Sequence, residues 1–157
     1  MINEEGIIGS QNSFIDISSN EYKKMQELLS QEYNKQTKKQ ILDNNIFSLK
    51  MKINHYLNDK NIIKIVFLGE FLKELIDIYD IKHKDFANYV DLTESNLSSI
   101  LSGKRKISND LAFKLDSIFK IDANIWINIQ NKNELLLIKN KNVNKYKKYT
   151  IKDLVKI

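Results

Sequence analysis

The residues with the most distinctive chemistry lie between Lys82 and Lys106, in the stretch KHKDFANYVDLTESNLSSILSGKRK. Its apolar residues predict two short helices joined by a tight turn, with the small Ala87 where the helices would cross. Leu92 would lie in the turn as an apolar plug, and Leu97 would bury the inner face of the second helix. This arrangement is typical of a helix-turn-helix, in which the second of the two helices enters the major groove of DNA.

The outer face of that second helix carries short polar side chains. They permit a close approach to DNA, and several can hydrogen-bond to the edges of bases. A basic loop follows the helix, where DNA phosphates would lie. The candidate face comprises Thr93, Glu94, Ser95, Asn96, Ser98 and Ser99, and the loop comprises Lys104, Arg105 and Lys106.

The composition argues against enzyme chemistry. The chain has no cysteine, two histidines, no proline and four glycines. A cysteine nucleophile, a thiolate zinc site, a histidine-rich metal site and a glycine-rich phosphate loop are therefore excluded. The acidic pairs Glu70/Glu74 and Asp77/Asp80 have helical spacing, which is typical of a solvated helix face. We therefore expect no catalysis, no cofactor and no metal.

The chain has 157 residues, a mass of 18.5 kDa and a net charge of +5 that is unevenly distributed. Residues 61–122, which contain the predicted helix-turn-helix, sum to −1, whereas residues 139–157 sum to +6. Such a basic tail is either a solvated segment or a contact for DNA phosphates. The longest uncharged apolar run, Ile65–Gly69, is much shorter than a membrane span, and Met1–Ser10 lacks the lysines of a signal peptide. We therefore expect a cytoplasmic protein.

The residues before the helix-turn-helix predict a flexible N-terminus followed by a helical hairpin. Residues 1–17 have no helical period, and Ser18-Ser19-Asn20-Glu21 has the form of a capping box that starts a helix. The polar stretch Asn34–Lys39 would interrupt this helix, and a second one would run from about Lys39 to Leu57. Its apolar residues repeat at intervals of four and three, so this face must pack on the first helix, on the rest of the chain or on a second subunit. These residues are Leu42, Ile46, Leu49, Ile53 and Tyr56.

Five helices are expected beyond the hairpin, and the predicted fold class is all-α. Residues 62–68 would form either a short strand or an extended entry into the first of them. Apolar residues at helical spacing predict helices near 71–79, 86–90, 97–101, 111–119 and 123–139, with Thr93 and Ser108 as N-caps and Gly103 closing the third. The predicted organisation is a flexible N-terminus at 1–17, a helical hairpin at 18–60, a helix-turn-helix domain at 61–138 and a basic C-terminal tail at 139–157, in which residues 151–157 could dock as a short helix.

The stretch FLKELIDIYDIKHKDFANYVDLTESNLSSILSGKRKISNDLAFKLDSIFKIDANIWINIQNKNEL resembles the phage-repressor-like helix-turn-helix domain of the XRE/Cro-C1 class, and more closely its HigA-type antitoxin branch. The loop SGKRKIS is typical of the wider superfamily. The continuation LAFKLDSIF and IDANIWINIQNKNEL favours the antitoxin branch. The resemblance covers roughly Leu68 to Ile138, and it implies a five-helix domain that is preceded here by the N-terminal hairpin.

This resemblance implies a homodimer that binds a palindromic operator in double-stranded DNA, often its own promoter, and that commonly neutralises a RelE/HigB-like toxin that cleaves mRNA. It also implies roles for individual residues. His83 and Thr93 would contact phosphates, Glu94, Ser95 and Ser99 would read bases, and Asn96 would contact the backbone. Lys104, Arg105 and Lys106 would form a phosphate-contacting loop. Trp126 and Ile129 would serve dimer or core packing.

Two positions depart from the family pattern. Asp91 stands where the family usually has glycine, so we expect a left-handed backbone there, which aspartate tolerates better than most residues. Glu94 would repel phosphates unless it accepts a hydrogen bond from a cytosine amino group. The leading hypothesis is a sequence-specific DNA-binding regulator and, within that class, an antitoxin that represses its own operon. The alternatives are a stand-alone repressor and a protein-interaction module that has kept the fold but lost DNA binding.

Overall fold

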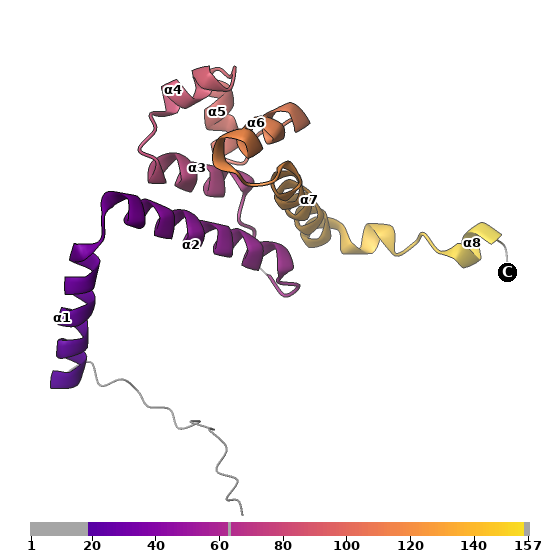
Figure 1. Ribbon diagram of the computed structural model, residues 1–157. Coiled ribbons are helices and arrows are strands. Elements are labelled where there is room, and N and C mark those ends of the chain that lie inside the picture. Colours follow the sequence, from indigo (N-terminus) through magenta and orange to yellow (C-terminus); the bar gives the residue numbers. More distant parts are fainter. Residues whose placement is uncertain (1–18, 63, 156–157) are drawn as a thin grey trace, which may run out of the picture. The chain divides into compact units, whose positions relative to one another are not determined.

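A computed structural model describes residues 19–62 and 64–155 of the chain, which form eight helices and no strand (Figure 1). The predicted all-α fold is therefore confirmed for this part of the chain. Residues 64–67, for which the sequence left a strand open, are in neither helix nor strand, and Phe67 has extended backbone angles where α3 begins. The helices are α1 (Asn20–Lys35), α2 (Lys38–Asn58), α3 (Leu68–Ile78), α4 (His83–Tyr89), α5 (Glu94–Leu101), α6 (Asn109–Phe119), α7 (Ala123–Tyr146) and α8 (Ile151–Val155).

The described residues divide into two compact units, one up to Gln40 and the other from Ile41 onward. In the first unit, the hydroxyl of Ser19 caps α1 by accepting a hydrogen bond from the backbone N–H of Tyr22 at 3.1 Å. The flexible segment predicted at 1–17 and the capping residue predicted at Ser18 lie outside the described residues. None of the residues Asn20–Lys35 is buried.

The predicted interruption after α1 is confirmed. Gln36 has extended backbone angles, and Thr37 and Gln40 then exchange hydrogen bonds. The Thr37 N–H donates to the Gln40 side chain at 2.8 Å, and the Gln40 N–H donates to the Thr37 hydroxyl at 3.2 Å. This reciprocal pair is a capping box, which satisfies two of the free N–H groups at the start of α2. Packing of the two helices as a hairpin stays a prediction.

The core of the second unit lies among α3–α7 and the C-terminal half of α2. Leu49, Ile53 and Tyr56 of α2 are buried in it, so for these three residues the apolar seam packs on the rest of the chain. The Tyr56 hydroxyl donates to the Asn133 side chain of α7 at 2.5 Å. The compact unit therefore begins within α2, and the division at residue 60 that the sequence pattern favoured does not follow it.

The helix that bears Trp126 supplies the largest side chain of the core. Trp126 and Ile129 are both fully buried, and the indole N–H of Trp126 donates to the carbonyl oxygen of Ile121 at 3.1 Å. The predicted end of this helix at Lys139 is wrong, because α7 continues to Tyr146 across a kink at Asn142. Neither proline nor glycine occurs after Gly103, so no residue of those types stops the helix there.

The basic segment at the C-terminal end is partly helical. Its short helix α8 forms where the sequence predicted one, but none of the residues Ile151–Val155 is buried, so the predicted docking is not seen for them. Among the described residues, no helix has the length and apolar character needed to cross a membrane.

Candidate nucleic-acid interface

The turn between α4 and α5 sets the geometry of the candidate interface. Asp91 adopts a φ of +61°, which confirms the left-handed backbone expected at that position. The next residue, Leu92, is half-buried and donates its backbone N–H to the carbonyl oxygen of Ala87 at 2.8 Å. Ala87 itself is fully buried where α4 packs against α5. The predicted tight turn with an apolar plug is thus present.

Lys114 of α6 holds this turn from the outside. Its ammonium donates to a carboxylate oxygen of Asp91 at 2.9 Å and to the carbonyl oxygen of Val90 at 3.2 Å, and it lies 3.1 Å from Asp110. The hydrogen bond to Asp91, followed by the one to Asp110, raises the pKa of the Lys114 ammonium above its ordinary value. Lys114 therefore stays charged at neutral pH, and it offsets part of the negative charge of Asp91 and Asp110.

Helix α5 begins at a capped end. The Thr93 hydroxyl accepts a hydrogen bond from the backbone N–H of Asn96 at 3.1 Å, which is the N-cap that the sequence predicted. The inner face of α5 is apolar, with Leu97 and Ile100 both buried. The helix is therefore anchored along one side, and its opposite side is free to carry the polar residues.

The side chains on the polar face of α5 differ in how much of their surface solvent can reach. Glu94, Ser95 and Ser98 are exposed, whereas Asn96 and Ser99 are half-buried on the side that faces the following loop. The Ser99 hydroxyl donates to the carbonyl oxygen of Ser95 at 2.9 Å. A serine hydroxyl keeps its acceptor lone pairs in such a bond, so Ser99 can still accept from a donor on a base.

The basic loop is fastened to the end of α5. The backbone N–H groups of Lys104 and Arg105 both donate to the carbonyl oxygen of Ser99, at 2.9 and 3.0 Å. Gly103 precedes them with a φ of +73°, a backbone conformation that suits glycine. The Arg105 guanidinium donates to the side-chain oxygen of Asn96 at 2.8 Å. Both cationic side chains are exposed beside the polar face.

The third cation of the loop is arranged differently. Lys106 is also exposed, but its ammonium lies 2.6 Å from a carboxylate oxygen of Glu134 in α7. One turn earlier in α7, the Gln130 side chain accepts from the backbone N–H of Ile107 at 2.8 Å and donates to its carbonyl oxygen at 3.4 Å. Helix α7 thus fixes the far end of the loop, and sequence reasoning missed both of these residues because they lie more than twenty positions away.

His83 is brought to the same surface by the packing of α4. It is the exposed first residue of α4, and it lines a hollow of about 580 Å³ together with residues of α5. Lys73 of α3 and Ser102 line this hollow too, and neither was predicted. Ser102 follows Ser98 at helical spacing and could have been found from the sequence, whereas Lys73 is placed only by the packing of α3. The lining residues are Lys73, His83, Glu94, Ser95, Leu97, Ser98, Leu101 and Ser102.

Two of the predicted residues lie elsewhere. Trp126 and Ile129 are fully buried in the core of one chain, so they are not part of the polar surface. The described residues contain no group of three histidine, cysteine, aspartate or glutamate side chains placed to hold a metal ion. The chemistry available at the α4–α5 surface is therefore hydrogen bonding by short polar groups, flanked by Lys104, Arg105 and the N-terminus of α4.

Comparison with known proteins agrees with this geometry. Over 63 residues, which are 40% of its length, the chain is 27% identical to the uncharacterised HTH-type transcriptional regulator YddM of Escherichia coli K12, and the match spans 67% of that protein. Over 69 residues it is 25% identical to the regulator YbaQ of the same strain, where the match spans 61% of the relative. No family model matches the chain.

A solved structure extends the comparison to the fold. An addiction module antidote protein of a HigA family from Coxiella burnetii matches with a TM-score of 0.51 and 24% identity, over 56% of this chain and 97% of that one. The chain is a relative of helix-turn-helix transcriptional regulators and has the fold of this HigA-family antidote. The resemblance predicted from the sequence is thereby confirmed. In this helix-turn-helix, α4 and α5 are the two helices of the motif.

Proposed function

We propose that the chain is a cytoplasmic, sequence-specific DNA-binding transcriptional regulator. One observation carries this proposal. The short helix α5 presents an exposed polar face. At its C-terminal end, the carbonyl oxygen of Ser99 accepts hydrogen bonds from the backbone N–H groups of Lys104 and Arg105. Groups that can read bases and groups that can bind phosphates are thus held in one rigid unit. Its similarity to helix-turn-helix regulators supports the same function.

In the proposed complex, α5 lies in the major groove and α4 lies across the DNA backbone. Glu94, Ser95 and Ser99 contact base edges, with Glu94 accepting from a cytosine amino group. His83, at the start of α4, and Thr93 contact phosphates on one side, while Lys104 and Arg105 contact them on the other. Asn96, held by Arg105, contacts the backbone. Lys106 binds a phosphate after its ammonium has left the carboxylate of Glu134.

The regulator is proposed to act as a homodimer on a palindromic operator. One α5 reads only a short half-site, and a two-fold pair of them would read two half-sites about one helical turn, roughly 34–36 Å, apart. The basic segment from residue 139 onward, at +6 over 139–157, would add phosphate contacts that depend on salt concentration.

The proposal is tested by fluorescence anisotropy of the full chain against the duplex upstream of its own gene and a scrambled duplex, across a salt series. We expect tight binding to the native duplex, clear discrimination and a steep dependence on salt. Equal and weak binding to both duplexes would refute it and would favour a protein-interaction module that keeps the fold.

Within this class we propose a HigA-type antitoxin that represses its own operon and neutralises a RelE/HigB-like toxin. The fold of the Coxiella antidote supports this assignment. Its test is co-expression with the protein encoded beside it. We expect the two to co-purify, and the neighbour alone to arrest growth through mRNA cleavage. A neighbour that neither binds nor is toxic would leave a stand-alone repressor.

A further inference from the structure

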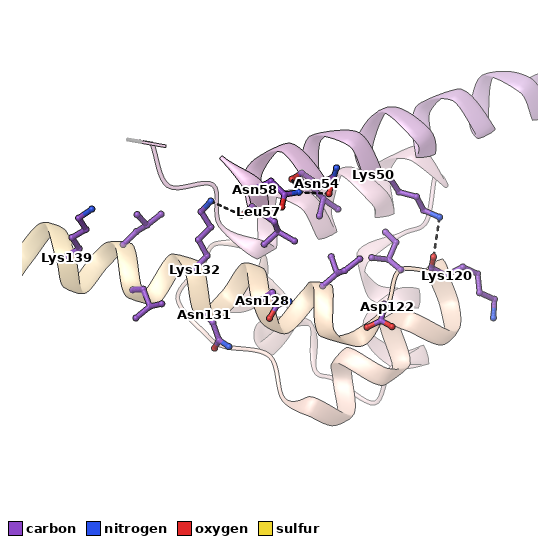
Figure 2. A pocket seen from close by; sticks show the side chains of 15 residues that line it. Lys50, Asn54, Leu57, Asn58, Lys120, Asp122, Asn128, Asn131, Lys132 and Lys139 are labelled. Atoms are coloured by element: carbon purple, nitrogen blue, oxygen red, sulfur yellow. Dashed lines mark hydrogen bonds between the residues drawn. The ribbon is translucent and has the colours of Figure 1, made fainter. Parts of the chain in front are cut away.

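A groove runs between α2 and α7, and Lys139 is the one lining residue that it shares with the proposed DNA contacts (Figure 2). Its volume is about 700 Å³. It is lined by Lys50, Ile53, Asn54, Leu57 and Asn58 of α2, by Lys120, Ile121 and Asp122 of the connection before α7, and by Ile125, Asn128, Asn131, Lys132, Leu135, Leu136 and Lys139 of α7.

The floor of the groove is apolar. Ile53 and Ile121 are buried beneath it, and Leu57, Ile125 and Leu136 are half-buried. Leu135 belongs to the same lining but is 67% exposed. A large aliphatic side chain in that position contributes apolar surface that remains in contact with water in the single chain, and its burial by a partner would be favourable.

The rim of the groove is basic. Four lysines line it, against the single carboxylate of Asp122. The Lys132 ammonium is bonded to the carbonyl oxygens of Tyr56, Leu57 and Asp59, and the Lys50 ammonium donates to the carbonyl oxygen of Lys120 at 3.2 Å. These partners are uncharged carbonyl groups, so neither ammonium is paired with a carboxylate through these contacts. Figure 2 shows Lys50 and Lys120 at one end of the groove and Lys139 at the other.

The length of the groove matches that of a helix of about four turns. The lining of α7 runs from Ile125 to Lys139, which at a rise of 1.5 Å per residue is about 21 Å, or roughly four turns. We propose that this groove docks an amphipathic helix of another protein, whose apolar stripe is flanked by aspartate or glutamate residues. The stripe covers Leu135 and the apolar floor, and the acidic flanks pair with the exposed rim lysines Lys120 and Lys139.

The test uses the full chain and two synthetic helical peptides of about 18 residues with the same leucine stripe at i, i+3, i+4 and i+7. One peptide has glutamate flanks and the other has lysine flanks. Titration by fluorescence anisotropy is expected to show saturable binding of the glutamate peptide and about tenfold weaker binding of the lysine peptide, which is within the range that two exposed ion pairs provide. Methyl NMR spectra are expected to place the shift changes at Ile121, Ile125 and Leu135.

Matched variants separate the groove from the general charge of the protein. Lys120→Glu with Lys139→Glu is expected to remove the preference for the glutamate peptide. Lys147→Glu with Lys148→Glu, which changes the net charge equally on exposed residues outside the groove, is expected to preserve it.

A second pair of variants tests the apolar contact. Leu135→Ser is expected to weaken binding at least about tenfold, since it removes a large buried aliphatic side chain from the interface. Phe113→Ser serves as its control, because Phe113 is 66% exposed on α6 and lies outside the groove. Duplex DNA binding of these four variants is measured in parallel, so that failure of this proposal is distinct from failure of the proposed regulator function.

Several results would overturn the proposal. They are the absence of saturable binding, equal binding of the two peptides, and binding that the groove variants leave unchanged. Sedimentation equilibrium showing self-association that Leu135→Ser abolishes would assign the groove to a second copy instead. Competition by duplex DNA, together with a loss of DNA binding in the variant with Lys120→Glu and Lys139→Glu that the variant with Lys147→Glu and Lys148→Glu does not share, would assign it to nucleic acid.

Discussion

The packing of α3 against the end of α5 depends on Gly69. A Cβ atom at this position would lie 2.3 Å from the carbonyl oxygen of Ile100 and 2.4 Å from that of Leu101. Both oxygens belong to the backbone at the C-terminal end of the proposed recognition helix. Because backbone atoms cannot rotate away as a side chain does, Gly69→Ala forces the two helices apart.

The cost of this substitution follows from the distances. Non-bonded heavy atoms prefer a separation of about 3.5 Å, so the helices must part by about 1 Å. Overpacking costs about 1–3 kcal/mol, and two backbone contacts place this site near the upper value. Alanine gains about 1 kcal/mol over glycine within a helix. The net expectation is a loss of about 2 kcal/mol, or about 8 °C in Tm for a unit of this size.

The assay is thermal and urea unfolding followed by circular dichroism, with Asp77→Ala as the control. Asp77 is exposed on the same helix, so its substitution is expected to change stability by less than about 0.5 kcal/mol. Helix propensity alone predicts that Gly69→Ala stabilises the protein. An unchanged or higher Tm would therefore refute the close approach of α3 and α5.

Four further substitutions test the interface and its support. Arg105→Ala is expected to weaken binding to every duplex and to reduce the slope of log K against log salt by about 1, as measured by anisotropy. Ser99→Ala is expected to change sequence preference more than affinity in a competition series of altered duplexes. Tyr56→Phe leaves the buried amide oxygen of Asn133 without its donor, which is expected to cost about 1–3 kcal/mol in urea unfolding. Gln130→Ala removes the two hydrogen bonds that hold the end of the basic loop, and we expect a loss of about 1–2 kcal/mol together with weaker DNA binding.

Three of these expectations have a specific contrary result. A salt slope unchanged in Arg105→Ala would remove the loop from the interface, and uniform weakening in Ser99→Ala would mean that this residue touches only the DNA backbone.

Burial raises the pKa of the Tyr56 hydroxyl above about 10, so the unionised form is favoured in the folded state. The contribution of the Tyr56 hydroxyl to the free energy of unfolding is fully present below about pH 10, and it is lost as the pH rises through the pKa of the folded state. A Tyr56→Phe variant that loses stability above pH 10 as steeply as the parent would contradict that contribution.

Much of the local structure could be read from neighbouring residues. Thr93 and Ser108 cap their helices as predicted, because each hydroxyl meets an N–H group three positions later. The left-handed backbone at Asp91 was expected from the family resemblance, because glycine usually stands at this position of the turn. The end of α7 was misplaced, because asparagine- and lysine-rich sequence after Lys139 carries no strong stop signal, and the helix continues to Tyr146.

By itself, the sequence determined the all-α class, the order and caps of the central helices, and the polar face of α5 with its basic loop. These features depend on contacts within about one helical turn, which the spacing of residues records. Only the tertiary structure decided that Tyr56 of α2 reaches Asn133, that α7 holds the basic loop through Gln130 and Glu134, and that α2 and α7 enclose a groove. Those pairings join residues 23 to 77 positions apart, and they exist because packing apolar faces brings distant polar groups within hydrogen-bond distance.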